Sequence, residues 1–210
     1  MPHPSSKVHP MTSHELSTAP PTMRNVSFAV VDFETTGLNP ETDRIVQLAA
    51  IIVNGEGNIV DSFDTIVKPE SPSEYQHGAE HIHGISAEQV SGGMPLRNAL
   101  EQLWSINTGH IFTAHNAAFD LGFLHAESER VGIEGRIEFH IDTLELSRRT
   151  TGADTTRRHN LLALCEHYGI ERDQVHDARS DATATAQLLM HLIKELGVEM
   201  PDQVAELFAP

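Results

Sequence analysis

The chain has 210 residues, 39% of them hydrophobic, which suits one domain of ordinary size with a proper core. No apolar run reaches the roughly 18 residues that a membrane helix needs, and the N-terminus lacks an apolar signal core. The single cysteine excludes an internal disulfide, so we expect a cytoplasmic protein without membrane attachment. The formal net charge of −16, from 30 acidic and 14 basic residues, argues against tight wrapping of duplex nucleic acid, because that binding depends on Lys and Arg.

The N-terminal segment differs in composition from the rest of the chain. It is rich in Pro, Ser, Thr and His and has no apolar period, which predicts a disordered tail at 1–25. Its histidines could bind a transition metal, but their irregular spacing favours a solvated tail. We expect one globular domain at 26–197 and a short C-terminal tail at 198–210.

The first expected strand, 28–34, is apolar except for two acidic residues at its end. Side chains alternate faces along a strand, so Asp32 and Glu34 point the same way. Two close carboxylates repel each other, and a hard divalent cation such as Mg²⁺ removes that cost. The turn at 35–37 would expose backbone N–H groups where a substrate could lie. The alternative is an acidic strand end with solvated charges.

Two further strands are expected at 45–54 and 59–67, joined by the turn sequence at 55–58. A turn of this kind between two apolar runs predicts an antiparallel hairpin. Gln47 falls among apolar residues, and we expect it to face a polar neighbour near the strand end that carries the acidic residues.

Helices come next in the chain. Ser86 begins a capping box and therefore a short helix, and 96–106 has the pattern of a longer one. A short strand is expected at 109–114, and a last strand at 137–141. Strands that start antiparallel and then alternate with helices predict an α/β fold.

The helix expected at 117–130 follows a polar turn formed by His115 and Asn116. Asp120 lies in the first turn of this helix, where the helix dipole favours negative charge. The alternative interpretation is a simple N-terminal charge behind a turn that caps its own backbone.

The helix expected at 178–196 has apolar residues at helical spacing, and Asp177 or Ser180 would cap its start. Asp181 projects from an early turn, which suits a metal ligand, because a ligand benefits from a rigid element. His176 lies on the approach loop and would be able to accept a proton near neutral pH. The alternative is a capped helix with a surface histidine.

Three segments of the chain are similar to the exonuclease motifs of the DEDDh branch of the DnaQ-like 3′–5′ exonucleases. That family includes the proofreading epsilon subunit of bacterial DNA polymerase III and ribonuclease T. The matching segments are VDFETTG at 31–37, HNAAFD at 115–120 and HDARSD at 176–181, within a resemblance that spans roughly 27–195. The resemblance implies a ribonuclease-H-like fold, with a five-stranded mixed sheet flanked by helices and the site at the carboxyl end of the first strand.

The resemblance also implies a role for each matched residue. Asp32 would bridge two Mg²⁺ or Mn²⁺ ions, Glu34 and Asp181 would complete the shell of one ion, and Asp120 would hold the other. His176 would take the proton of the attacking water, giving a nucleoside 5′-monophosphate. The positions expected to bind substrate are Thr35, Thr36, Gly37, His83, Ile85, His115, Asn116 and Phe119.

These expectations describe a metal-dependent 3′–5′ exonuclease that acts on single-stranded nucleic acid, with DNA favoured, in proofreading, repair or turnover. One alternative is an RNA exonuclease of the ribonuclease T or oligoribonuclease type. Another is an inactive nucleic-acid-binding or scaffold module. The expected partners are single-stranded 3′ ends, together with a possible polymerase or repair protein, and the sequence leaves both a monomer and a homodimer open.

Overall fold

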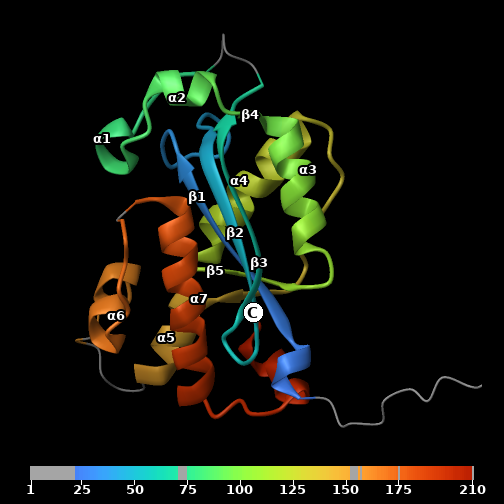
Figure 1. Cartoon of the computed structure of the whole chain (residues 1–210), viewed down its shortest axis with the longest axis vertical. Helices are drawn as coiled ribbons and strands as arrows, with labels where there is room; N and C mark the ends of the chain where they lie inside the picture. Colours follow the sequence, from blue (N-terminus) through green and yellow to red (C-terminus); the bar gives the residue numbers. More distant parts are fainter. Residues whose placement is uncertain (1–21, 71–74, 152–155, 157, 175, 210) are drawn as a thin grey trace, which may run out of the picture.

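The computed structural model describes residues 22–209 except 71–74, 152–155, 157 and 175 (Figure 1). The tail expected at 1–25 therefore lies almost entirely outside the described residues. The described chain forms one mixed sheet with the strand order β4-β3-β2-β1-β5-β6 and helices on both faces, which confirms the α/β, ribonuclease-H-like class.

The strands are β1 (Ser27–Thr35), β2 (Ile45–Asn54), β3 (Ile59–Lys68), β4 (Met94–Pro95), β5 (Ile111–Ala114) and β6 (His140–Asp142). The helices are α1 (Glu80–His83), α2 (Ala87–Ser91), α3 (Leu96–Asn107), α4 (Ala117–Arg130), α5 (Thr143–Thr151), α6 (Leu161–Tyr168) and α7 (Ala178–Glu195). Two 3₁₀ helices, η1 (Met23–Asn25) and η2 (Pro201–Leu207), lie near the ends of the described chain.

The sheet has six strands where five were expected. The additional strand, β4, has two residues and pairs in parallel with Val67 and Lys68 at the end of β3. A two-residue strand carries no periodic signal, so only its neighbour in the sheet defines it. The expected strand at 137–141 was also misplaced, because the ladder with β5 begins at His140 and ends at Asp142.

The centre of the sheet is formed by β1 and β2, which pair antiparallel along their whole lengths. All ten residues of β2 are buried. The expected hairpin between β2 and β3 is confirmed, and the Asn54 side chain accepts hydrogen bonds from the amides of Glu56 and Asn58 at its turn. On its other edge β1 pairs in parallel with β5, which is shorter and leaves the end of β1 projecting past it.

The two faces of the sheet are covered by different helices. Figure 1 shows α5, α6 and α7 on one side and α3 and α4 on the other. Phe28 and Val30 of β1 pack in the core on the α7 side, whereas Val31 and Phe33 pack in the core on the α3 and α4 side. Because side chains alternate along β1, the even-numbered residues that follow Val30 also face α7.

The C-terminal residues fold back onto the domain. Val204 and Leu207 of η2 are buried in the same core as α7, and the Ala209 amide donates to the His140 carbonyl in β6. Within the ranges that the structure describes, no helix is long and apolar enough to cross a membrane.

Candidate active site

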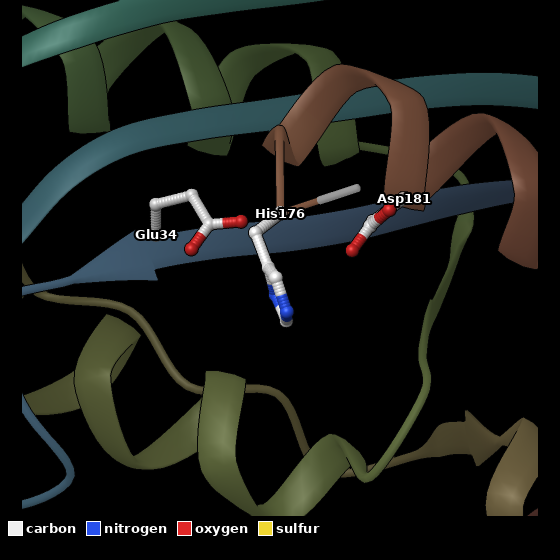
Figure 2. Close-up of side chains that lie close together, drawn as sticks. All are labelled: Glu34, His176 and Asp181. Atoms are coloured by element: carbon white, nitrogen blue, oxygen red, sulfur yellow. The ribbon is translucent and has the colours of Figure 1, made fainter. Parts of the chain in front are cut away.

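Side chains from β1 and from the start of α7 meet beside the projecting end of β1. Glu34, His176 and Asp181 each present one potential ligand atom, and these atoms lie within 4.8 Å of one another. Figure 2 shows the two carboxylates flanking the His176 side chain, with Glu34 on β1 and Asp181 on α7. This arrangement follows from the strand alternation that turns Glu34 toward α7.

Asp32 lies in the same group of acidic side chains. Burial raises its pKa well above the ordinary value, and the negative charges of Asp120, Asp181 and Glu34 raise it further. Burial also raises the pKa of Glu34 to about 7, with further contributions from Asp181 and Asp177. The four carboxylates that the sequence singled out are therefore close enough to repel one another.

Asp120 reaches this group from the other face of the sheet. It lies in the first turn of α4 and is 3% exposed, and burial raises its pKa well above the ordinary value. The backbone amide of Phe33 donates to its carboxylate and partly offsets that rise. Because β5 ends before β1 does, the start of α4 comes to lie beside the last residues of β1.

His176 is exposed and lies on the short approach to α7, with a left-handed backbone φ of 57°. Asp177 caps the helix by accepting from the Ser180 amide at 2.9 Å, which decides between the two expected caps. Gln47 of β2 contacts the same turn, since its Nε2 donates to Asp177 and its Oε1 accepts from the Ala178 amide. The polar neighbour expected for Gln47 is thus the start of α7.

Arg172 is a site residue that the sequence did not indicate. Its guanidinium forms an ion pair with Asp181, and its side chain is only 7% exposed. The residue lies in the loop between α6 and α7, outside the three motif segments, and no periodic or motif signal marks it.

His115 and Asn116 form the turn between β5 and α4, as expected. The Asp142 carboxylate accepts hydrogen bonds from the amides of Asn116 and Ala117, and Asn116 has a φ of 68°. His115 Nδ1 lies 2.9 Å from Thr143 Oγ1, on the β6 side of the turn and not among the carboxylates. Burial lowers the pKa of His115 to about 4, so this imidazole is neutral near pH 7.

The turn after β1 is held by its own hydrogen bonds. The Thr36 amide donates to the Arg44 carbonyl at 3.0 Å, and the Arg44 amide donates to Thr36 Oγ1 at 3.0 Å. The Thr36 N–H is therefore engaged within the protein and is not open to a substrate, which corrects the expectation for that amide. Thr35 Oγ1 donates to the Gly37 carbonyl.

The remaining expected substrate positions lie around this turn and on α4. His83 and Ile85 are 5% and 6% exposed, and the Ile85 amide donates to His83 Nδ1. Their loop approaches the β1 turn closely, since a Cβ on Gly78 would lie 2.4 Å from the Thr36 carbonyl oxygen. Phe119 of α4 is half-buried, and its ring centroid lies 4.9 Å from that of Phe123.

The donor set fits hard divalent cations. Four carboxylates supply oxygen ligands, and their raised pKa values show that the protein alone stabilises their negative charges poorly. Cations bound among them would remove that cost, and oxygen-rich acidic sites are preferred by Mg²⁺ and Mn²⁺.

The chain matches a family model described as “Exonuclease” over residues 29–189. It is 34% identical over 174 residues to the “DNA polymerase III PolC-type” of Streptococcus thermophilus and 37% identical over 175 residues to that of Staphylococcus saprophyticus. Each alignment covers 83% of this chain and 12% of the polymerase, so the chain spans about an eighth of the length of these relatives.

Solved structures share the fold. E. coli Exonuclease I in complex with a dT13 oligonucleotide superposes with a TM-score of 0.73 and 21% identity, over 82% of this chain and 42% of that one. The nuclease domain of 3′hExo, a DEDDh family member bound to rAMP, superposes with a TM-score of 0.69 and 17% identity, over 80% of this chain and 92% of that one. With the family match and the PolC-type relatives, the resemblance in the three acidic segments is confirmed, and this chain belongs to the exonuclease family as a DnaQ-like member.

Proposed function

We propose that the chain is a metal-dependent 3′–5′ exonuclease that releases nucleoside 5′-monophosphates from the 3′ ends of single-stranded nucleic acid, with DNA preferred. The convergence of four carboxylates from β1, α4 and α7 beside an exposed histidine carries this proposal. DNA is favoured because the similar PolC-type proteins are DNA polymerases and because Exonuclease I, which shares the fold, was solved with a DNA oligonucleotide.

We assign Asp32, Glu34, Asp120 and Asp181 as the residues that hold two divalent cations, Mg²⁺ or Mn²⁺. When bound, such ions activate a water molecule and stabilise the charge that develops on the attacking and leaving oxygens. The carboxylates would hold the ions near the end of β1, because Asp32 and Glu34 share a strand face and the other two lie in first turns of helices.

His176 acts as the general base in this proposal. Its imidazole lies beside Glu34 and Asp181, it is exposed to solvent, and it is attached to the loop that precedes α7. A neutral imidazole can accept the proton of the attacking water as the oxygen bonds to phosphorus and the 3′ oxygen of the shortened strand leaves.

The terminal nucleotide would lie between the β1 turn and the start of α4. Phe119 offers a half-buried ring there, and the turn residues Thr35 and Gly37 border the same end of β1. His83 and Ile85 support the loop against this turn, and His115 and Asn116 hold the start of α4. The strongly acidic chain would grip a strand end weakly, which fits a partner such as a polymerase or repair protein that delivers it in the cytoplasm.

The test is release of mononucleotide from a 3′-end-labelled DNA strand in Mn²⁺ and in EDTA. We expect release only with Mn²⁺, and none from Asp32→Ala or Asp181→Ala. Asp202→Asn, an exposed acid on η2, serves as the matched control and should retain full release. Equal rates in the wild type, Asp32→Ala and Asp181→Ala would refute the assignment.

Matched RNA strands in the same assay decide the substrate class. Faster release from RNA would establish the ribonuclease alternative, and binding without release would establish the scaffold alternative. Light scattering of the purified chain distinguishes a monomer from a homodimer.

A further inference from the structure

Arg172 is a buried cation at the edge of the carboxylate group. Its Nη2 donates to Oδ1 of Asp181, and the two side chains are 7% and 10% exposed. Among the residues that the structure describes, none accepts a hydrogen bond from Arg172 Nε, which is shielded from solvent. A buried guanidinium with an unused donor costs free energy, so its position requires compensation by nearby negative charge.

That compensation extends beyond Asp181. The positive charge of Arg172 counteracts the rise in pKa that burial imposes on Asp32, Glu34 and Asp181. The guanidinium therefore acts on three of the four acidic residues, which come from both β1 and α7. Without bound metal, it offsets part of the repulsion among them.

A cation bound by Asp181 would lie next to the Arg172 guanidinium. The carboxylate has two oxygens, and one of them already accepts from Arg172. The other potential ligand atoms of the group, on Glu34 and His176, lie within 4.8 Å of the Asp181 ligand atom. A divalent ion among these atoms would be close to a fixed positive charge, and like charges repel.

We propose that Arg172 is the resident counter-ion of the metal-free site, and that a divalent cation must displace its guanidinium from Asp181 in order to bind. This inference rests on the proposed metal-dependent function. Arg172 then stabilises the fold before metal binds and weakens the binding of the cation that Asp181 shares with Glu34. Asp181 thus has two alternative partners, the Arg172 guanidinium within the protein and a divalent cation from solution.

The experiment compares Mn²⁺ binding by calorimetry and Tm in EDTA for the wild type, Arg172→Met and Arg172→Lys. Met keeps much of the buried aliphatic length and removes the charge, so we expect Arg172→Met to bind Mn²⁺ about tenfold more tightly. Its Tm should be lower in EDTA and should rise more on adding Mn²⁺. Arg172→Lys keeps the charge and should stay close to the wild type.

Arg179→Met is the matched control, because Arg179 also forms an ion pair near the start of α7, with Asp64, but is exposed. It should leave both Mn²⁺ affinity and Tm unchanged. Unchanged or weaker Mn²⁺ binding by Arg172→Met overturns the inference, since the guanidinium would then support the metal site.

An Arg172→Met chain that is unfolded in EDTA but folds on addition of Mn²⁺ supports the inference. The same chain remaining unfolded at saturating Mn²⁺ overturns it, because the cation would not replace the guanidinium. No Mn²⁺ binding by the wild type or any variant would instead remove the proposed metal site itself.

Discussion

Gln47 and Asp177 are joined by a hydrogen bond of 2.9 Å between residues that lie on β2 and at the N-cap of α7. The same amide accepts from the Ala178 amide at 3.1 Å. Through these two contacts the central strand of the sheet fixes the turn that carries His176 and leads to Asp181. Gln47 is therefore a positioning residue for the proposed chemistry.

Gln47→Leu should misplace His176 without removing any proposed ligand. We expect kcat to fall on the order of tenfold to hundredfold, with little change in KM, because small displacements of a reacting group are costly. Steady-state kinetics on a single-stranded DNA substrate measure both constants. Gln102→Leu on the exposed face of α3 is the control, and an equal loss in the two variants would argue against positioning by Gln47.

Asp32→Asn should stabilise the metal-free protein while it abolishes activity. Asn is isosteric and removes one negative charge from a group in which burial and three neighbouring carboxylates raise the pKa of Asp32. We expect the free energy of unfolding in EDTA at pH 8 to rise, because the unfolded chain ionises this carboxyl in water whereas the folded chain must hold the charge in a buried, negatively charged site. Urea denaturation measures this change.

Adding Mn²⁺ should reverse the order of stability, since the wild type gains binding energy that Asp32→Asn loses. A metal-free Asp32→Asn protein that is less stable than the wild type would show that repulsion from the neighbouring carboxylates does not make Asp32 destabilising.

His115 should make stability depend on pH. Burial lowers its pKa from the ordinary 6.5 to about 4, so as pH falls the unfolded chain takes up this proton before the folded chain does. The contribution is complete above pH 6.5 and is lost progressively as pH falls from 6.5 to 4. The stability lost by this route amounts to about 2 kcal/mol at pH 5.

Urea denaturation in EDTA at pH 7 and pH 5, on the wild type and His115→Gln, isolates this contribution because the other histidines are common to both. We expect the wild type to lose about 2 kcal/mol more than the variant between these pH values. Parallel losses would mean that His115 can be protonated in the folded protein at pH 5.

His176→Ala should separate chemistry from metal binding. Loss of a general base is expected to lower kcat by about 10² to 10⁴. Mn²⁺ affinity measured by calorimetry should stay within a few-fold of the wild type, since the four carboxylates remain. Asp181→Ala is the contrasting variant and should lose both activity and Mn²⁺ affinity. Strong loss of Mn²⁺ binding in His176→Ala would show that the imidazole is a metal ligand and not a base.

Local pattern determined much of this fold. The alternation of β1 turned Asp32 and Glu34 to one face, and the turn sequence after β2 specified the hairpin. The polar turn at His115 and Asn116 located the start of α4, and helical periodicity located α7. Strand alternation, turn chemistry and the helical repeat depend on neighbours a few residues away, so a single sequence contains them. The family could be recognised for the same reason, because each of its motifs is a short segment.

What the sequence alone could not supply depends on residues that are distant in the chain. Strand β4 exists only because the end of β3 lies beside it, and the Thr36 amide is engaged only because Arg44 folds back onto the turn. Arg172 became a partner of Asp181 when the loop after α6 was packed against α7.

The amino-acid sequence by itself determined which side chains carry the acidic chemistry and which face of each element they occupy. The tertiary structure decided how near the four carboxylates come to one another and how deeply they are buried. It also placed the Arg172 guanidinium beside Asp181. These properties depend on burial and on charges supplied by other elements, and electrostatic energies change steeply with both.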